Sequence, residues 1–299
     1  MIAMDMDGTL LRSDDTLSQQ TKYLLIELQK NGTKLVLASG RSHRRMLQYA
    51  KELQMDQYGG WLIEVNGIAT YDVANNKCYV NGRMPIADAQ KLMRYFQQYK
   101  VEIIGNLDAE MFVYIPEWMM SEKIAYMQEH QLPSDHPYTG GAFKFVYDAR
   151  NGYPDIYYIQ SAEELTKEVN KICITYHPEV IAKVEQQARK DLGNDYWLGL
   201  TSPKWLEVMM KNISKGHSLQ QLMQKFNIDA KDVIAFGDGE NDLEMLQTAG
   251  TGIAMGNALD VLKQQADKVT LSNNEDGIYF AIKSILDEKQ HILCYTKDK

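Results

Sequence analysis

The amino-acid sequence predicts an α/β protein whose doubly wound, mostly parallel core sheet is interrupted by an inserted α+β domain. Short apolar runs alternate with amphipathic helical patterns in the first third of the chain. The composition then becomes richer in Tyr, Met and Gln between residues 86 and 200, and the alternation returns at Trp205. We therefore expect a discontinuous core, residues 1–83 and 202–299, and an inserted domain, residues 84–201.

The first segment is expected to supply three parallel strands, each followed by polar residues or glycine. The strands are the N-terminal apolar run that ends at Asp5, then 34–38 and 61–65, with helices from Ser18 to Asn31 and from about 42 to 53, and a hairpin at 68–71 and 77–80. Ligands of such Rossmann-like sheets bind beyond the C-terminal strand ends. Asp5, Ser39 and Asn66 all follow strands in this way, so we expect them at one edge.

The middle segment reads as helices alternating with antiparallel strands. We expect helices at 86–98, 117–130, 162–169 and 178–191, strands at 101–107, 110–115, 171–176 and 196–200, and an irregular stretch at 133–154.

The last segment returns to the strand–helix order. We expect strands at 205–209, 232–236 and 252–255, helices after His217, over 243–246 and from about 276 to 287, and a loose tail from Glu288 to Lys299.

The composition excludes several classes of function. The chain has 299 residues, a net charge of -8 and a pI near 5.3, which argues against general nucleic-acid binding but not against a phosphorylated substrate. Three widely spaced cysteines form no disulfide framework, which favours the cytoplasm. Because no run approaches the roughly 18 apolar residues of a membrane span, we expect no membrane association and exclude a membrane pump.

Asp5 and Asp7 are the first candidate functional residues. Residues two apart in an extended segment project to the same side, so we expect the two carboxylates to crowd one spot beside Gly8. Such a pair repels unless a proton or cation lies between its members. Mg²⁺ takes carboxylate and phosphate oxygens as ligands, and a carboxylate can itself be a phosphate-accepting nucleophile. The alternative is a turn in which an aspartate caps the strand.

Polar or glycine residues end four segments in order: Asp-Met-Asp-Gly-Thr-Leu from Asp5, Ser-Gly-Arg from Ser39, the loop at Lys215, and Gly-Asp-Gly-Glu-Asn-Asp from Gly237. With these motifs on an α/β alternation, the chain resembles the haloacid dehalogenase superfamily of phosphatases, and most closely its Cof-type subfamily, which carries a large α/β cap. The first and last motifs are specific, whereas Ser-Gly and a lone lysine are not.

The resemblance implies roles for these residues. Asp5 is the expected nucleophile and Asp7 the general acid and base, and Mg²⁺ is expected on the Asp5 carboxylate, the Asp7 backbone carbonyl and the Asp238 carboxylate. Asp242 is a further residue that supports the metal site. The expected phosphate-binding groups are the backbone N–H groups at Met6 and Gly40, the Ser39 hydroxyl, the Lys215 ammonium and the Asn241 amide.

Each assignment has a structural alternative. Ser39-Gly40 could be only a turn, Lys215 competes with Lys204 and Lys211, and Asp242 could equally cap the following helix. Arg41 could form a purely structural pair with a carboxylate. Three residues stay outside the catalytic set: Asn66, Asn257 and His217.

The resemblance implies a Mg²⁺-dependent phosphatase that hydrolyses a small phosphorylated metabolite, such as a sugar phosphate or pyridoxal phosphate, through an aspartyl-phosphate. One alternative is a phosphotransferase or mutase that uses the same intermediate. Another is a non-catalytic metabolite-binding regulator. The sequence leaves open the substrate and whether the protein is a monomer or a homo-oligomer.

Overall fold

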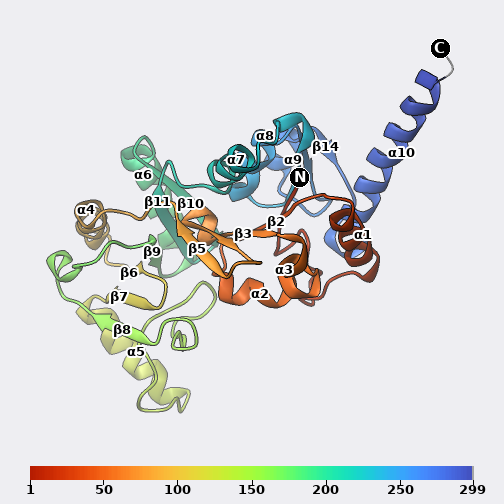
Figure 1. The fold of residues 1–299 in the computed structure, drawn as a ribbon. Helices are drawn as coiled ribbons and strands as arrows, with labels where there is room; N and C mark the ends of the chain where they lie inside the picture. Colours follow the sequence, from red (N-terminus) through yellow and green to blue (C-terminus); the bar gives the residue numbers. More distant parts are fainter. Residues whose placement is uncertain (298–299) are drawn as a thin grey trace. The chain divides into compact units, whose positions relative to one another are not determined.

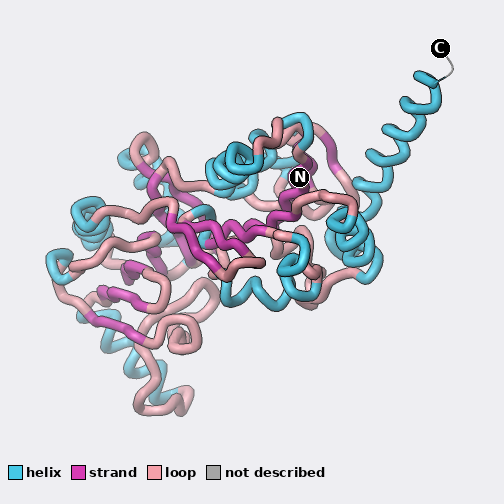
Figure 2. Tube along the Cα trace, in the orientation of Figure 1, coloured by secondary structure: helices cyan, strands magenta, loops and turns pink. Residues whose placement is uncertain are grey.

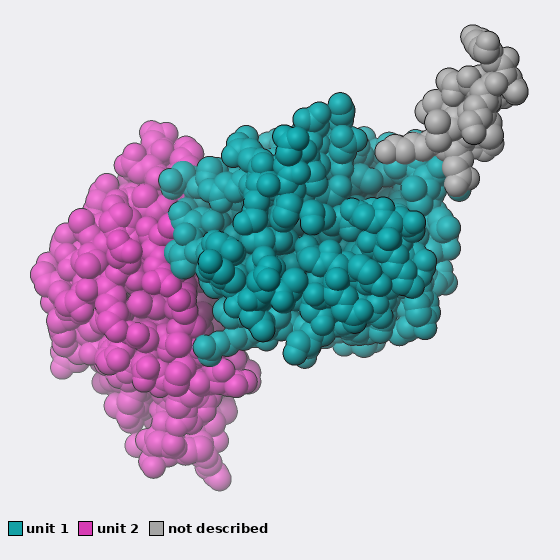
Figure 3. Space-filling view, viewed as in Figure 1, with its two compact units in different colours: residues 1–81, 212–299 teal, residues 82–211 magenta. Residues whose placement is uncertain are grey.

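The computed structural model describes the backbone of residues 1–297 and the side chains of residues 1–288. The chain divides into two compact units, shown in teal and magenta in Figure 3. Unit 1 comprises residues 1–81 and the segment that starts at residue 212, and unit 2 comprises residues 82–211. The first boundary lies two residues before the predicted one (81 against 83), and the second lies ten residues after it (211 against 201).

The strand Trp205–Met210 (β11) accounts for the second difference. It pairs antiparallel with β9 (Lys171–Thr175) and β10 (Tyr196–Ser202) in the sheet of unit 2, so its predicted place in the core is wrong. Between β10 and β11 lie only Pro203 and Lys204, a two-residue hairpin connection. A short, mostly apolar run such as residues 205–209 fits either kind of sheet, whereas the two-residue turn before it is typical of an antiparallel hairpin.

Unit 1 contains an eight-stranded sheet in the order β14-β13-β12-β1-β2-β3-β4-β5. Figure 1 labels β2, β3, β5 and β14 of this sheet, and Figure 2 draws the strands in magenta. Its strands are β1 (Ile2–Asp5), β2 (Leu35–Ala38), β3 (Trp61–Glu64), β4 (Ala69–Asp72), β5 (Lys77–Val80), β12 (Ile234–Gly237), β13 (Thr251–Ala254) and β14 (Lys268–Val269). All neighbours pair in parallel except β3–β4 and β4–β5, and the β4–β5 pair is the expected hairpin. The predicted doubly wound, mostly parallel sheet is confirmed.

Helices alternate with these parallel strands along the chain, and the last helix follows the last strand. They are α1 (Gln19–Lys30), α2 (His43–Glu52), α3 (Met55–Tyr58), α7 (Lys215–Phe226), α8 (Leu243–Thr248), α9 (Asp260–Gln265) and α10 (Gly277–Lys297). The side chain of Ser18 accepts a hydrogen bond from the Thr21 N–H and so caps α1, as expected. Buried strand residues such as Met4, Leu37 and Phe236 form the core with buried faces of the helices.

β1 is the central strand and lies between β2 and β12. It has four residues, as do both neighbours, and it pairs in parallel with each of them. Because the carboxyl ends of parallel strands meet at one edge, the residues that follow Asp5, Ala38 and Gly237 are brought together there.

Unit 2 contains a six-stranded sheet in the order β10-β11-β9-β6-β7-β8. The three strands not yet given are β6 (Glu102–Asn106), β7 (Glu110–Tyr114) and β8 (Asp155–Tyr158), and the helices are α4 (Ile86–Gln97), α5 (Glu117–Glu129) and α6 (Pro178–Leu192). All pairs are antiparallel except β7–β8. Ile103 and its neighbour Ile104 belong to two separate apolar clusters, because successive strand residues face opposite sides of the sheet.

Two predictions near helices are wrong. The helix predicted at 162–169 is only one 3₁₀ turn, Ala162–Glu164, after which the chain is extended and Val169 forms a β-bridge with Met84. A Ser161–Glu164 capping box begins this segment, and the single turn satisfies it. Helix α10 continues through Lys297, so the predicted loose tail is wrong as far as that residue, and the last two residues lie outside the described part.

The elements that sequence patterns missed are short: α3, α9, β8 and β14. The stretch 133–154 carries no helix or strand, as expected. Among the described helices, none has the length and apolarity that crossing a membrane requires.

Candidate active site

The Lys215 ammonium lies at the centre of a buried acidic cluster at the C-terminal edge of the unit 1 sheet. Its Nζ is 2.5 Å from Asp5 Oδ1, at the end of β1, and 2.6 Å from Asp242 Oδ1. Lys215 is the first residue of α7, which begins where the Ser214 hydroxyl accepts a hydrogen bond from the His217 N–H. Of the three candidate lysines, the structure therefore brings Lys215 to Asp5. His217 itself is exposed on the helix face, as expected.

Carboxylates outnumber the single ammonium in this cluster. Oxygen atoms of Asp5, Asp238 and Asp242 all lie within 4.8 Å of one another. Burial raises the pKa of Asp5 well above its usual range, and the charges of Asp242 and Asp238 add to that effect, while Lys215 opposes it. Burial also raises the pKa of Asp238 to about 6, against the hydrogen bond that it accepts from Thr9. The excess negative charge and the all-oxygen donor set fit a hard divalent cation such as Mg²⁺.

Asp242 also organises the loop that follows β12. Its Oδ2 accepts hydrogen bonds from the N–H groups of Asp238 and Gly239, at 3.0 and 2.9 Å, while Oδ1 faces Lys215. A side chain at Gly237 would lie 2.4 Å from Asp242 Cβ, so the loop needs glycine there. The reading of Asp242 as a cap of the following helix is wrong, because its side chain makes no cap hydrogen bond to α8 and instead closes the 3₁₀ turn before it, while Asp242 also belongs to the acidic cluster.

The turn after β1 places Asp238 against the backbone of Gly8. Gly8 has φ +82°, and a Cβ atom there would lie 2.3 Å from Asp238 Oδ2. The neighbouring Thr9 hydroxyl donates to Asp238 Oδ1 at 2.7 Å. Asn257, which follows β13, donates its amide N–H to the Gly8 carbonyl at 2.8 Å. Sequence reasoning assigned no role to Thr9 or Asn257, although both follow strand ends in the motif-bearing segments.

The loop after β2 is tied to the residues after β3. The Asn66 N–H donates to the Ser39 carbonyl at 3.0 Å, and the Ser39 hydroxyl accepts from the Arg41 N–H at 3.1 Å. Asn66 has a left-handed backbone, and its Oδ1 accepts from the Asn241 amide at 2.9 Å. Asn66 therefore links Asn241 to the loop that carries Ser39 and Gly40, a connection that the sequence did not reveal.

Asp7 does not join Asp5 in the acidic cluster. Both oxygens of its half-exposed carboxylate accept from the Arg41 guanidinium, with Arg41 Nε 2.9 Å from Oδ2, and Arg41 also bonds Asp15 at 3.1 Å. The expectation that Asp5 and Asp7 crowd one spot is therefore wrong for this conformation, because each carboxylate has its own cation. The alternative that Arg41 pairs with a carboxylate is confirmed. Met6, between the two aspartates, has a buried side chain, so only its backbone could contact a ligand.

The family model of haloacid dehalogenase-like hydrolases matches residues 2–282.

The chain belongs to this family.

Curated relatives from Bacillus subtilis include a 5-amino-6-(5-phospho-D-ribitylamino)uracil phosphatase, 27% identical and covering 93% of this chain and 94% of its own length. A second phosphatase from that bacterium is 26% identical, and the match covers 96% of this chain and 99% of the relative's length. A crystal structure of a haloacid dehalogenase-like hydrolase from Bacteroides thetaiotaomicron superposes with a TM-score of 0.69 at 28% identity. The match covers 95% of this chain and 98% of that chain. The predicted family and the predicted enzyme class, a phosphatase of this family, are confirmed.

Proposed function

We propose that this hydrolase is a Mg²⁺-dependent phosphomonoesterase that acts on a small phosphorylated metabolite through an aspartyl-phosphate on Asp5. The observation that carries the proposal is the Asp5 carboxylate, which the buried Lys215 ammonium holds at 2.5 Å within an acidic cluster at the carboxyl edge of a parallel sheet. A carboxylate fixed beside a cation is oriented to attack phosphorus, and the cation is placed to neutralise phosphoryl charge.

Mg²⁺ would be held by the Asp5 and Asp238 carboxylates and the Asp7 backbone carbonyl, with Asp242 in support. When bound, it supplies positive charge to the phosphoryl oxygens. The donor set agrees with this assignment because Asp5, Asp238 and Asp242 offer oxygen atoms only.

In the first step an Asp5 oxygen forms a bond to phosphorus while the bond from phosphorus to the leaving alkoxide breaks. Asp7 donates the proton that the alkoxide takes up. In the second step Asp7 removes a proton from water, the water oxygen bonds to phosphorus, and the Asp5–phosphorus bond breaks to release phosphate. The Arg41–Asp7 pair must open for Asp7 to perform either transfer.

The phosphoryl oxygens would be surrounded by donors from three loops. These are the backbone N–H groups at Met6 and Gly40, the Ser39 hydroxyl, Lys215 and the Asn241 amide. Preorganised donors of this kind are the main source of catalysis in phosphoryl transfer. We assign the choice of substrate to unit 2, the inserted cap, and retain the cytoplasm as the predicted location.

Replacing the nucleophile tests the proposal. Asp5→Asn keeps the shape of the side chain but removes its charge, so we expect kcat/KM for p-nitrophenyl phosphate in Mg²⁺ to fall by more than about 10⁴-fold. Asp229→Asn, at an exposed carboxylate, is the matched control and should keep wild-type activity. Wild-type turnover by Asp5→Asn would refute the nucleophile assignment. EDTA should abolish turnover, and added Mg²⁺ should restore it.

The alternatives differ in their products. A phosphotransferase or mutase would yield a transferred or isomerised phosphate ester, whereas the phosphatase releases free phosphate. A non-catalytic regulator would show thermal shifts with ligands and no turnover. A screen of sugar phosphates, nucleotides and pyridoxal phosphate with phosphate detection distinguishes the three, and the substrate of the ribitylaminouracil phosphatase relative belongs in that screen.

A further inference from the structure

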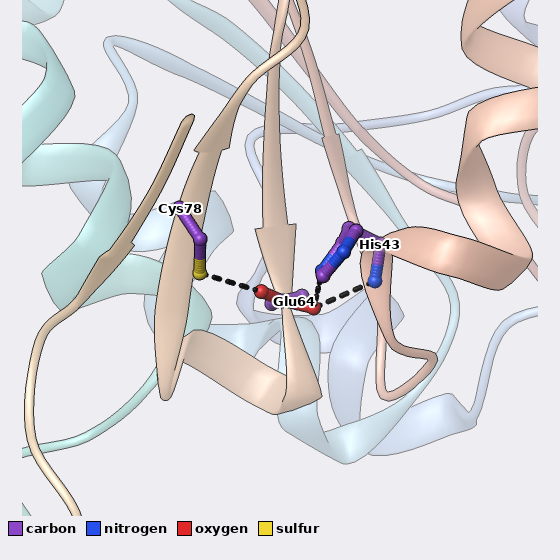
Figure 4. A group of neighbouring side chains, drawn as sticks. All are labelled: His43, Glu64 and Cys78. Atoms are coloured by element: carbon purple, nitrogen blue, oxygen red, sulfur yellow. Dashed lines mark hydrogen bonds and ion pairs between the residues drawn. The ribbon is translucent and has the colours of Figure 1, made fainter. Parts of the chain in front are cut away.

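A second cluster of ligating side chains lies in unit 1, apart from the acidic cluster. It consists of His43, the first residue of α2, Glu64, the last residue of β3, and Cys78 on the edge strand β5 (Figure 4). His43 Nδ1 is 2.8 Å from Glu64 Oε2, and the Cys78 thiol donates to Glu64 Oε1 at 3.2 Å. One ligand atom from each residue lies within 4.8 Å of the other two.

Strand register brings these side chains to one face of the sheet. Leu62 lies opposite Tyr71, and Tyr71 lies opposite Cys78, so side chains at these three positions share a face. Glu64 is two residues after Leu62 and projects to that same face. The Tyr71 ring stacks on the His43 imidazole, with ring centroids 4.4 Å apart and planes inclined by 8°. This stacking fixes the plane of the imidazole, which orients its Nδ1 towards the carboxylate.

The three donors differ in type from those of the acidic cluster. Imidazole nitrogen, thiolate sulfur and carboxylate oxygen are the three side-chain ligands that Zn²⁺ takes in proteins, whereas Mg²⁺ takes oxygen. One thiolate and one carboxylate together neutralise a divalent ion, which favours its transfer into a site where Glu64 is only 5% exposed. Cys78 is exposed, so an ion can reach the cluster from solvent.

We propose that His43 Nδ1, the Glu64 carboxylate and Cys78 Sγ form a binding site for a zinc-class divalent cation. Binding replaces the thiol S–H bond with a sulfur–metal bond and releases that proton to solvent. Three protein ligands leave one tetrahedral position for water or another small ligand. No oxidation or reduction is involved.

The site is connected through the backbone to the loop that carries Ser39 and Gly40. Val65 and Asn66 directly follow Glu64, and their N–H groups donate to the carbonyls of Arg41 at 3.1 Å and Ser39 at 3.0 Å. Glu64 Oε2 also accepts from the backbone N–H of His43 at 2.6 Å. A cation at the cluster therefore acts on a carboxylate that holds the end of this loop at His43, while the residues after Glu64 hold Ser39 and Arg41 through backbone hydrogen bonds.

Co²⁺ is the probe for the test, because a thiolate ligand produces a near-ultraviolet charge-transfer band that carboxylates do not. The full chain is titrated with Co²⁺ in excess Mg²⁺, and we expect the band to saturate at one equivalent and to disappear in Cys78→Ser. Cys173→Ser is the matched control, since Cys173 is buried in unit 2, and it should keep the band, as should Cys294→Ser.

Zinc affinity gives the second measurement. In competition with a chromophoric chelator, His43→Gln should bind Zn²⁺ more than about tenfold more weakly than wild type, since loss of a direct ligand costs at least as much as loss of a residue that orients one. Circular dichroism checks that each variant is folded, and Cys78→Ala replaces Cys78→Ser if that variant is not. A wild-type chain without the band, or a band that survives at Cys78→Ser or Cys78→Ala, would show that the cluster is only a hydrogen-bond network. Neither result depends on phosphatase activity.

Discussion

Among the residues whose side chains the structure describes, Lys215 in unit 1 and Lys123 in unit 2 have fully buried side chains, and the two lysines have different charge environments. In unit 1, Lys215 contacts Asp5 and Asp242, with Asp238 beside them, so one ammonium faces three carboxyl groups. In unit 2, Lys123 on α5 faces a single carboxylate, with Nζ 2.8 Å from Glu102 Oε2 and 2.6 Å from the Phe145 carbonyl.

Both carboxylate oxygens of Glu102, the partner of Lys123, have hydrogen-bond or ion-pair partners. Its Oε1 accepts from the Thr139 hydroxyl and the Gly140 N–H, each at 2.8 Å, and the Phe145 ring covers Lys123 Nζ at 4.4 Å from the ring centroid. The Lys123 pair is thus neutral and complete, whereas the Lys215 cluster keeps an excess of negative charge. Burial alone does not distinguish a functional lysine from a structural one, but the local charge balance does.

The largest expected effect is on the stability of unit 2. Lys123→Met leaves the Glu102 charge buried without its cation, so the free energy of unfolding should fall by about 3–5 kcal/mol. Chemical denaturation of the full chain measures it. Adding Glu102→Gln should recover part of the loss, because the orphaned charge is then gone. Equal stabilities of wild type and Lys123→Met would contradict a closed, neutral pair.

At Lys215 we expect the main effect on catalysis instead. Lys215→Met removes a positive charge from the proposed phosphoryl site, so kcat/KM should fall by about 10²–10³-fold. The fold should persist, because the remaining carboxyl groups can take up protons or Mg²⁺. Lys211→Met is the control: that lysine contacts only backbone carbonyls of Gly193 and Asn194, and its variant should keep wild-type kinetics. A Lys215→Met enzyme with unchanged kcat/KM would remove the distinction between the two lysines.

A smaller effect should appear as a pH dependence of stability in the metal-free protein. The pKa of Asp238 is about 6 when folded and about 3.9 when unfolded, so the folded state holds the extra proton between these values. The stabilisation is complete below pH 4 and is lost as the pH rises through 6.

Asp238→Asn replaces the carboxyl group with an amide that stays neutral at every pH of the experiment. In EDTA at pH 7 the variant should therefore be more stable than wild type, by up to about 3 kcal/mol, while at pH 4 the two should agree. Thermal unfolding at both pH values measures the difference. A variant less stable than wild type at pH 7 would mean that the cluster is not overcharged.

The sequence could predict the parallel sheet and the edge where Asp5, Ser39 and Asp238 meet, because apolar periodicity and strand-end motifs are local signals. It could not predict that Lys123 is buried, since the partner Glu102 lies on another element and a lysine within a helix usually faces solvent. It also could not place β11 in the second sheet or Arg41 on Asp7, because both depend on pairing between distant segments. Motifs of neighbouring residues could therefore be predicted from the sequence, whereas contacts between residues far apart in the chain could not.

Gly67 follows Asn66 in the loop after β3, and its backbone lies directly against the start of α7. With φ at +106°, a Cβ atom there would lie 2.3 Å from the carbonyl oxygen of Ser214, the residue before Lys215. Even the methyl group of an alanine would displace the first turn of α7, and this displacement would break the 2.5 Å contact between Lys215 and Asp5. Because Gly67 has no side chain, the first turn of α7 can pack against the loop after β3. This close packing fixes the distance between the Lys215 ammonium and Asp5.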